Sequence, residues 1–260
     1  MNIRVHYEKL TAQITLSTPH KGNAFDHQMI LDLTHAISQA SQHPDIRVIV
    51  LSGEGKHFCS GGDLQWMKES VKLSAQENAS QSQDLFDLFE SLSQSPKVTI
   101  ALAKGSSYGG GVGLLACCDF VYAKEDSRFC LSEAKVGLMP ATIAPFVAQK
   151  IGWHKTKQLG IRANVIDVQQ ARQYGLVDGI AQEESDLIDL TNQCIEEVKK
   201  CSPESIKKYK ELVREAMHMD ASQLRLRTSE MIAQIRISPM GQEGLQAFIE
   251  KRKPSWDSHE

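Results

Sequence analysis

A strand, a glycine-rich turn and a short buried helix follow one another between residues 98 and 118. The apolar run at 98–103 predicts a buried strand, and the run at 112–118 predicts a buried helix. Gly109, Gly110 and Gly111 separate the two. Because the first N–H groups of a helix have no intrahelical partner, and glycine lets a ligand approach them closely, this turn can bind a negatively charged group. A tight turn that uses glycine only for packing is the alternative.

A second glycine turn lies upstream, in the segment Ser60-Gly61-Gly62-Asp63. It follows an apolar run at 48–51, which predicts another buried strand. If the two turns meet in space, each can offer one backbone N–H to the same carbonyl oxygen, which is the arrangement of an oxyanion hole. Such a pair would suit a thioester that becomes an enolate. Periodicity alone leaves open whether the turns meet.

The composition is that of an ordinary globular protein. The 260 residues are 41% apolar and 23% charged, and the net charge of -3 indicates neither a nucleic-acid nor a membrane partner. No apolar run approaches the roughly 20 residues of a membrane helix, and the first residues lack a signal-peptide core. We therefore expect a cytoplasmic protein. The six cysteines show no C-x-x-C pair and no zinc spacing, so we expect reduced cysteines and no metal.

The pattern of strands and helices changes near residue 180. Before that point, strands are predicted within 3–18 and at 48–51, 98–103, 120–123 and 129–131, in alternation with helices, which is typical of an α/β fold. After it, residues 184–200, 203–218, 222–237 and 241–252 have helical spacing. We expect an α/β core over residues 1–185 and a helical region over 186–260, whose apolar side chains need a surface to pack against.

The segment at 68–83 is rich in Ser, Gln, Glu and Lys. We interpret it as a solvated helix or loop. A mobile cover over a site is the alternative, because such a segment has little apolar surface to hold it in place. Residues 85–92 then predict a separate, short amphipathic helix.

Seven motifs, in the same order along the chain, resemble those of the crotonase (enoyl-CoA hydratase/isomerase) family. They occupy residues 19–25, 58–64, 105–119, 129–133, 136–140, 171–178 and 241–252. The resemblance implies a spiral of ββα units with a helical trimerisation region at the C-terminus. It implies an acyl-CoA thioester substrate, of which coenzyme A is a part, and no further cofactor or metal. It also implies a homotrimer or a dimer of trimers.

The resemblance further implies roles for individual residues. The backbone N–H groups of Gly62 and Gly110 would form the oxyanion hole. Lys56 and Lys251 would contact phosphates of coenzyme A, and Lys251, with Phe248, would serve a neighbouring subunit's site. The complete set predicted to bind the acyl-CoA is Ala24, Lys56, Cys59, Gly62, Leu64, Gly110, Gly113, Phe248 and Lys251.

The chain departs from the family at one of two usual glutamates. Family hydratases carry one glutamate where this chain has Gly113, and the second is present as Glu133. A single carboxylate suits a double-bond isomerase, which takes a proton from one carbon and returns it to another. Residues 109–119, 131–133 and 141–147 nevertheless resemble most the bacterial hydratases of methylglutaconyl-CoA and isoprenoid glutaconyl-CoA, in which that position is also glycine. We expect such a hydratase, active in leucine or fatty-acid breakdown with Glu133 as its catalytic group, and keep the isomerase as the alternative.

Two further readings stay open. One is a non-catalytic protein that binds acyl-CoA or RNA on the same fold. The other is a serine hydrolase that uses Ser106, Ser107 or Ser132, although no histidine lies near them in a triad-like motif. We expect Asp119 to be a structural carboxylate at a helix–strand junction and His57 to be a loop residue, rather than groups that transfer protons.

Overall fold

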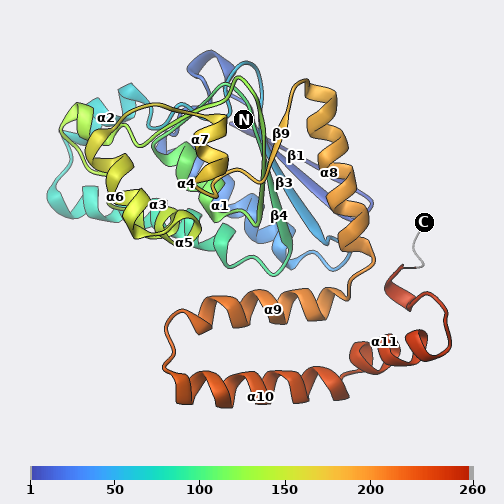
Figure 1. Cartoon of the computed structure of the whole chain (residues 1–260). Helices are drawn as coiled ribbons and strands as arrows, with labels where there is room; N and C mark the ends of the chain where they lie inside the picture. Colours follow the sequence, from blue (N-terminus) through green and yellow to red (C-terminus); the bar gives the residue numbers. More distant parts are fainter. Residues whose placement is uncertain (1, 258–260) are drawn as a thin grey trace. The chain divides into compact units, whose positions relative to one another are not determined.

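The computed structural model describes residues 2–257, in which a six-stranded sheet has the strand order β1-β2-β3-β4-β6-β9 (Figure 1). These strands are β1 (Ile3–Glu8), β2 (Thr11–Leu16), β3 (Val48–Gly53), β4 (Val98–Ala103), β6 (Phe120–Lys124) and β9 (Gly179–Ala181). β1 and β2 are antiparallel, as a short hairpin allows, whereas the pairs β2–β3, β4–β6 and β6–β9 are parallel. The predicted α/β class is confirmed.

A smaller sheet contains β5 (Ser106–Tyr108), β7 (Arg128–Cys130) and β8 (Ile166–Asp167). β5 runs parallel to β7, with Tyr108 opposite Cys130, and β7 is antiparallel to β8. Parallel strands end at the same edge of a sheet. The glycine turn that follows β5 and the segment of Glu133 that follows β7 therefore begin side by side.

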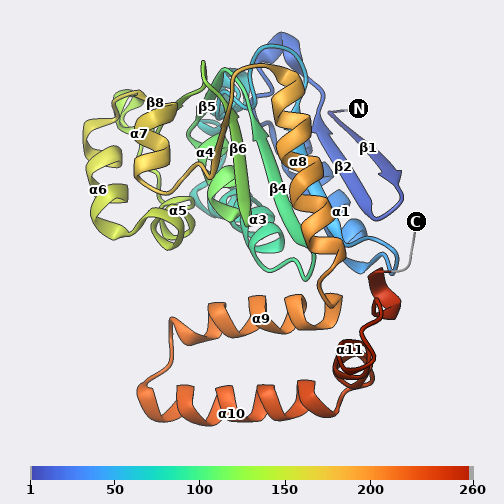
Figure 2. The same ribbon diagram turned by 45° about the vertical axis from the view of Figure 1, so that its right-hand side comes forward.

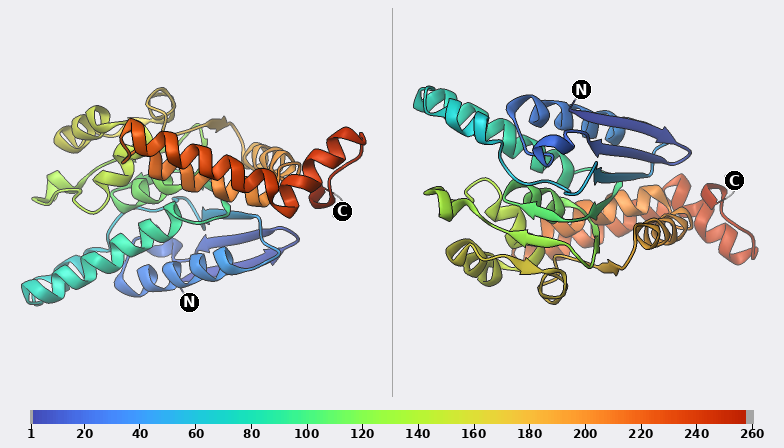
Figure 3. Two further views of the ribbon diagram at one scale, coloured as in Figure 1. Left: turned by 90° about the horizontal axis from the view of Figure 1, so that it is seen from below. Right: turned by 90° about the horizontal axis from the view of Figure 1, so that it is seen from above.

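Helices connect and cover these strands. They are α1 (His27–Gln42), α2 (Leu64–Ser70), α3 (Ala75–Ser93), α4 (Gly110–Cys117), α5 (Ala144–Ile151), α6 (Trp153–Arg162) and α7 (Val168–Gln173). Helix α3 packs along α1, and Figure 3 shows this long helix in cyan beside the blue one. Helix α4, which starts at the second glycine turn, is buried over almost its whole length. This burial fits the purely apolar character of its sequence.

The amphipathic helix predicted at 85–92 is present as the second half of α3, and most of the polar segment at 68–83 is helical as well, within the end of α2 and the first half of α3. A capping box starts the helix at Ser74, where the Ser74 hydroxyl accepts the Glu77 N–H and the Glu77 carboxylate accepts the Ser74 N–H. Only the second half of α3 buries apolar side chains, at Leu88, Phe89 and Leu92. The polar first half is therefore helical because of its cap rather than its packing.

Contacts within the chain divide the described residues into two units, one of residues 2–95 and 99–191 and the other of residues 96–98 and 192–257. The second unit holds α9 (Pro203–Ala216), α10 (Ala221–Ile237), α11 (Pro239–Ile249) and the end of α8 (Glu184–Lys199). Helices α9 and α10 run antiparallel as neighbours (Figures 1 and 2). The functions assigned to 1–185 and 186–260 remain predictions. Among residues 2–257, no helix is both long and apolar enough to cross a membrane.

Candidate functional site

The two glycine turns lie against each other. An isolated parallel bridge joins them, in which the Cys59 N–H donates to Ser106 O at 3.2 Å and the Tyr108 N–H donates to Cys59 O at 2.9 Å. The contact leaves no room for side chains. A Cβ on Gly111 would lie 2.5 Å from Cys59 O, and one on Gly61, whose φ is +100°, would lie 3.2 Å from Tyr108 O. Glycine is required at both positions for the turns to approach this closely.

Each turn presents a free backbone N–H. Phe25 pairs with the first turn, since its N–H donates to Gly61 O and its carbonyl accepts the Asp63 N–H, both at 2.7 Å. In extended backbone, the N–H and C=O groups of successive residues point to opposite sides of the chain. Because Gly61 and Asp63 bond Phe25, the N–H and C=O groups of Gly62 point away from Phe25. Gly110 is the first residue of α4, where an N–H has no intrahelical acceptor. Within residues 2–257, no atom accepts either the Gly62 or the Gly110 N–H.

The Glu133 carboxylate lies directly over the second turn. The Gly109 N–H donates to Cys130 O at 2.8 Å, which ties the N-cap of α4 to the end of β7. A Cβ on Gly109 would lie 3.0 Å from Glu133 Oε1 and 3.9 Å from Gly61 Cα. The carboxylate, the N-terminus of α4 and the first glycine turn thus meet within van der Waals reach of one another.

Burial gives Glu133 an altered proton affinity. Its Oε2 atom is buried and has no hydrogen-bond partner in the described part of the chain. Burial disfavours the charged form and raises the pKa of Glu133, and the Glu133 backbone N–H offsets only part of this effect. A half-buried carboxyl whose pKa is raised by burial is a candidate for an acid–base group.

Gly113, one turn further along α4, faces an apolar environment instead. A Cβ there would lie 2.8 Å from Ile143 Cγ2 and 2.9 Å from two ring atoms of Phe89. Phe89 is held in turn by Phe146, with ring centroids 5.7 Å apart. The space in which a second carboxylate would begin is therefore filled by aromatic and aliphatic side chains, and Glu133 is the carboxylate that lies at the second turn.

Asn23 and His57 hold the loops that carry the turns, and the sequence pattern gave neither of them this role. Asn23 is fully buried, and its backbone is left-handed, with φ +56°. Its Oδ1 accepts the Thr18 N–H at 3.0 Å. Its Nδ2 donates to Glu54 O at 2.9 Å and to His57 O at 2.8 Å. His57 Nδ1 accepts the Ser106 N–H at 3.0 Å. Both side chains therefore fix backbone. The position of Asn23 within the 19–25 motif was the available signal.

The other predicted binding residues are in different surroundings. Ala24 and Cys59 are buried, whereas Lys56 and Leu64 are exposed. Burial raises the pKa of the Cys59 thiol to about 12, with the Gly61 N–H acting in the opposite direction, so the thiol is neutral at physiological pH. The exposed Phe248 and the left-handed Lys251 (φ +56°) belong to the second unit, and their role at a neighbouring subunit's site stays a prediction.

Asp119 links the end of α4 to the sheet. Its Oδ2 accepts from the Thr99 N–H at 2.8 Å and from Thr99 Oγ1 at 3.0 Å, and its own N–H donates to Thr99 Oγ1 at 2.9 Å. These bonds fit the structural role expected for Asp119. Ser107 is fully buried, which does not suit a hydrolase nucleophile that must reach a bound substrate.

Comparisons with known proteins agree on one family. The sequence model described as "Enoyl-CoA hydratase/isomerase" matches residues 7–259. Enoyl-CoA hydratase ACTT6 of Alternaria alternata is 34% identical over 81% of this chain and 69% of its own. The crotonyl-CoA hydratase of Syntrophomonas wolfei is 27% identical over 99% and 98%. The crystal structure of an enoyl-CoA hydratase from Shewanella pealeana superposes with a TM-score of 0.95 at 33% identity, over 98% and 96%, so the predicted crotonase-type fold is confirmed.

The packing around Gly113 predicts the effect of adding a side chain. Gly113→Ala should lower the free energy of unfolding by about 1–3 kcal/mol, the usual cost of overpacking, because Phe89 and Ile143 must both move. Gly160→Ala in α6 is the matched control: its Cβ would meet only Pro140 Cγ at 3.5 Å, so it should stabilise the helix by up to about 1 kcal/mol. Urea unfolding of the two variants measures the difference, and equal stabilities would contradict the packing described for Gly113.

The burial of Glu133 predicts a pH-dependent stability. Since its pKa is raised in the folded state, the folded protein binds more protons than the unfolded chain between the ordinary pKa and the raised one. Stability contributed by this group is therefore present at low pH and lost as the pH rises through that window. Glu133→Gln should become progressively more stable than the wild type in thermal melts as the pH rises above the ordinary pKa of 4.5. A constant difference in Tm would show that Glu133 is not perturbed.

Proposed function

We propose a hydratase function, because the chain belongs to the enoyl-CoA hydratase/isomerase family and places a perturbed carboxylate beside two free N–H groups. The reaction is the addition of water across the 2,3 double bond of an acyl-CoA thioester. One observation carries the proposal: Glu133 Oε1 lies 3.0 Å from where a Gly109 Cβ would stand, next to the turn of Gly61 and Gly62. The proposed acid–base group thus lies next to the proposed oxyanion donors.

The two glycine turns supply the electrostatic part of the reaction. The N–H groups of Gly62 and Gly110 donate to the thioester oxygen, and the N-terminus of α4 adds its positive dipole end. Negative charge grows on this oxygen as the β-carbon is attacked and the enolate forms. Preorganised donors stabilise that charge without reorganising during the reaction, and loss of one such donor in other enzymes costs about 10²–10³ in turnover.

Glu133 handles the protons. Attack by the water oxygen on the β-carbon breaks the π bond toward the thioester and requires the water to lose a proton, while the α-carbon must gain one. Glu133 can give its carboxyl proton to the α-carbon and take a proton from the attacking water, so that it ends the cycle as it began. Burial raises the pKa of Glu133, which favours the protonated form that the proton transfer to carbon needs.

Two alternatives differ from this proposal by their products. The single carboxylate also suits an isomerase, which would move the double bond along the acyl chain and add no water. A protein that binds acyl-CoA or RNA without chemistry would need neither a perturbed Glu133 nor two free N–H groups. Both features are present, and they favour an enzyme.

For the substrate we propose a branched or glutaconyl-type acyl-CoA, with no cofactor beyond the coenzyme A that the substrate carries. The support is the resemblance of residues 109–119, 131–133 and 141–147 to hydratases of that kind, including glycine at position 113. A cytoplasmic location and a place in leucine or fatty-acid breakdown remain predictions of the same kind.

We also propose a homotrimer or a dimer of trimers. In the second unit, apolar side chains on α10 and α11 are exposed, with Leu226 at 62%, Ile237 at 81% and Phe248 at 85%. So much apolar surface on neighbouring helices is typical of an interface. Light scattering should give three or six times the mass of one chain. A monomer at micromolar concentration would remove the predicted contribution of Phe248 and Lys251 to a neighbour's site.

The activity is tested with the purified protein and a small panel of thioesters: crotonyl-CoA, 3-methylglutaconyl-CoA and a 3-enoyl-CoA. Mass detection should find a product heavier by one water. Glu133→Gln keeps the shape of the side chain and removes its proton transfer, so kcat should fall by at least about 10²-fold. The control is Glu125→Gln, at an exposed glutamate in a turn, which should keep full turnover.

The outcomes separate the candidates. A shifted double bond without added water would identify an isomerase, and no product from any thioester would support a binding protein. If Glu133→Gln kept most of the activity, another residue would carry the proton transfer and the assignment made here would fail.

A further inference from the structure

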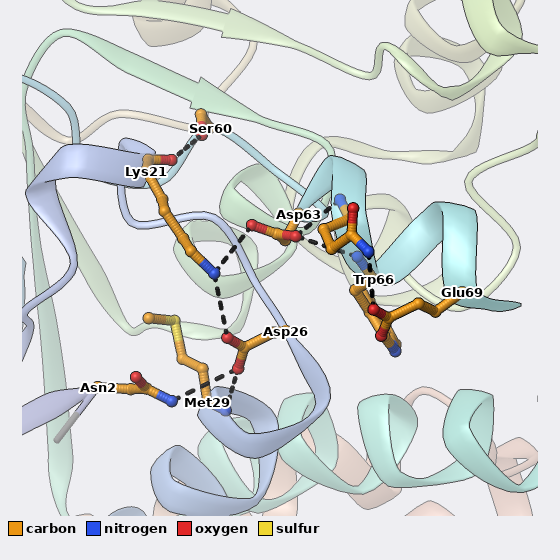
Figure 4. Close-up of polar contacts among 9 residues, drawn as sticks. Asn2, Lys21, Asp26, Met29, Ser60, Asp63, Trp66 and Glu69 are labelled. Carbon is orange, nitrogen blue, oxygen red and sulfur yellow. Dashed lines mark hydrogen bonds and ion pairs between the residues drawn. The ribbon is translucent and has the colours of Figure 1, made fainter.

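Lys21 lies between two carboxylates at the first glycine turn (Figure 4). It is the last residue of the short 3₁₀ helix η1 (Pro19–Lys21). Its Nζ is 3.3 Å from Asp63 Oδ2 and 3.7 Å from Asp26 Oδ2. One ammonium group thus bridges two aspartates that come from different segments of the chain.

Both aspartates cap helices. Asp26 Oδ1 accepts the Met29 N–H at 2.8 Å at the start of α1. Asp63 Oδ1 accepts the N–H groups of Gln65 and Trp66, at 2.8 and 3.0 Å, at the start of α2. Each carboxylate uses one oxygen for its helix and turns the other toward Lys21. The ion pairs therefore connect the N-termini of α1 and α2.

The backbone beside these caps belongs to the first glycine turn. Asp26 follows Phe25, Asp63 follows Gly62, and Phe25 and Gly62 form an isolated parallel bridge. Because the two segments are parallel, the Asp26 and Asp63 carboxylates both follow the Phe25–Gly62 bridge at its C-terminal end. Without a cation between them they would repel each other and push the two segments apart. The position of the Gly62 N–H depends on that separation.

The burial of Asp63 makes this repulsion matter. Its side chain is only 11% exposed, so water can screen its charge little. Burial alone would raise the pKa of Asp63, but hydrogen bonds from the Trp66 N–H, Lys21 and the Gln65 N–H outweigh it and lower the pKa below its usual range. Asp63 therefore stays ionised at neutral pH, and its charge repels the nearby Asp26 carboxylate.

Lys21 itself is poorly placed to bind a substrate phosphate. Its ammonium already faces two carboxylates, of which Asp63 contributes most to a raised pKa of Lys21. A phosphate would have to compete with both aspartates for this one cation. The geometry fits a part of the framework rather than a ligand of the acyl-CoA.

We propose that Lys21 is a positioning residue that fixes the Gly62 oxyanion donor by neutralising the helix-capping carboxylates Asp26 and Asp63. The inference rests on the proposed function, because it gives the Gly62 N–H a part in the reaction. Lys21 would act on turnover more than on substrate binding, since the charge on the thioester oxygen grows during the reaction.

The test compares Lys21→Met, Lys21→Arg and the double variant Lys21→Met/Asp26→Asn in the hydration assay. Lys21→Met should lower kcat about tenfold with less than a twofold change in KM, a smaller loss than the 10²–10³-fold of a deleted donor. Lys21→Arg keeps the cation and should retain most of the turnover. Asn caps a helix about as well as Asp, so the double variant removes the repulsion, keeps the cap of α1, and should recover most of kcat.

Lys104→Met is the matched control, because it breaks a shorter ion pair, 2.9 Å from Lys104 Nζ to Glu184 Oε1, with a carboxylate that belongs to neither turn. It should leave kcat unchanged. Thermal melts of all variants check that each is folded. If Lys21→Met keeps the wild-type kcat, or raises KM strongly with kcat intact, the positioning role is overturned. If the wild type hydrates no thioester, the proposed function itself fails, and that result is distinguishable from a failure of the Lys21 proposal.

Discussion

Backbone pairing between segments that are distant in the sequence brings the two glycine turns together. Phe25 holds the first turn from one side through bonds to Gly61 and Asp63, and Cys59 holds it to the strand that leads into the second turn. The proposed oxyanion hole depends on these few backbone bonds. They direct the Gly62 N–H away from Phe25 and place the start of α4 next to it. Side chains then act on a framework that the backbone has already fixed.

The missing side chains at the start of α4 let other elements approach the helix. Glu133 approaches at Gly109, Phe25 at Gly110, Cys59 at Gly111 and Phe89 at Gly113. These approaches differ in chemistry, since one brings a carboxylate and the others bring apolar or neutral groups. The carboxylate keeps a buried oxygen without a partner, which costs stability and is characteristic of a group reserved for chemistry. The site therefore combines one carboxylate that has an unpaired oxygen with tightly packed surroundings.

Local sequence patterns predicted many of the helices and strands. They were ambiguous where a segment does not owe its secondary structure to buried apolar side chains. The apolar runs at 48–51 and 98–103 are strands because both faces of a parallel sheet are covered. The polar residues before Leu85 left helix and loop open, because a capping box, not an apolar stripe, starts α3. Asn23 had no role of its own in the sequence analysis, yet its side chain bonds backbone groups of Thr18, Glu54 and His57.

The sequence by itself determined the α/β class, the two glycine turns and the single glutamate, because these depend on residue type and spacing. Its motifs also determined the family. Only the tertiary structure decided that the turns adjoin, that Glu133 lies over Gly109, that Phe89 fills the space at Gly113, and that Lys21 bridges two helix caps. The physical reason is that periodicity describes neighbours along one element. Contacts such as that between Gly61 and Tyr108 arise when separate elements pack, and the burial that perturbs Glu133 exists only in the assembled fold.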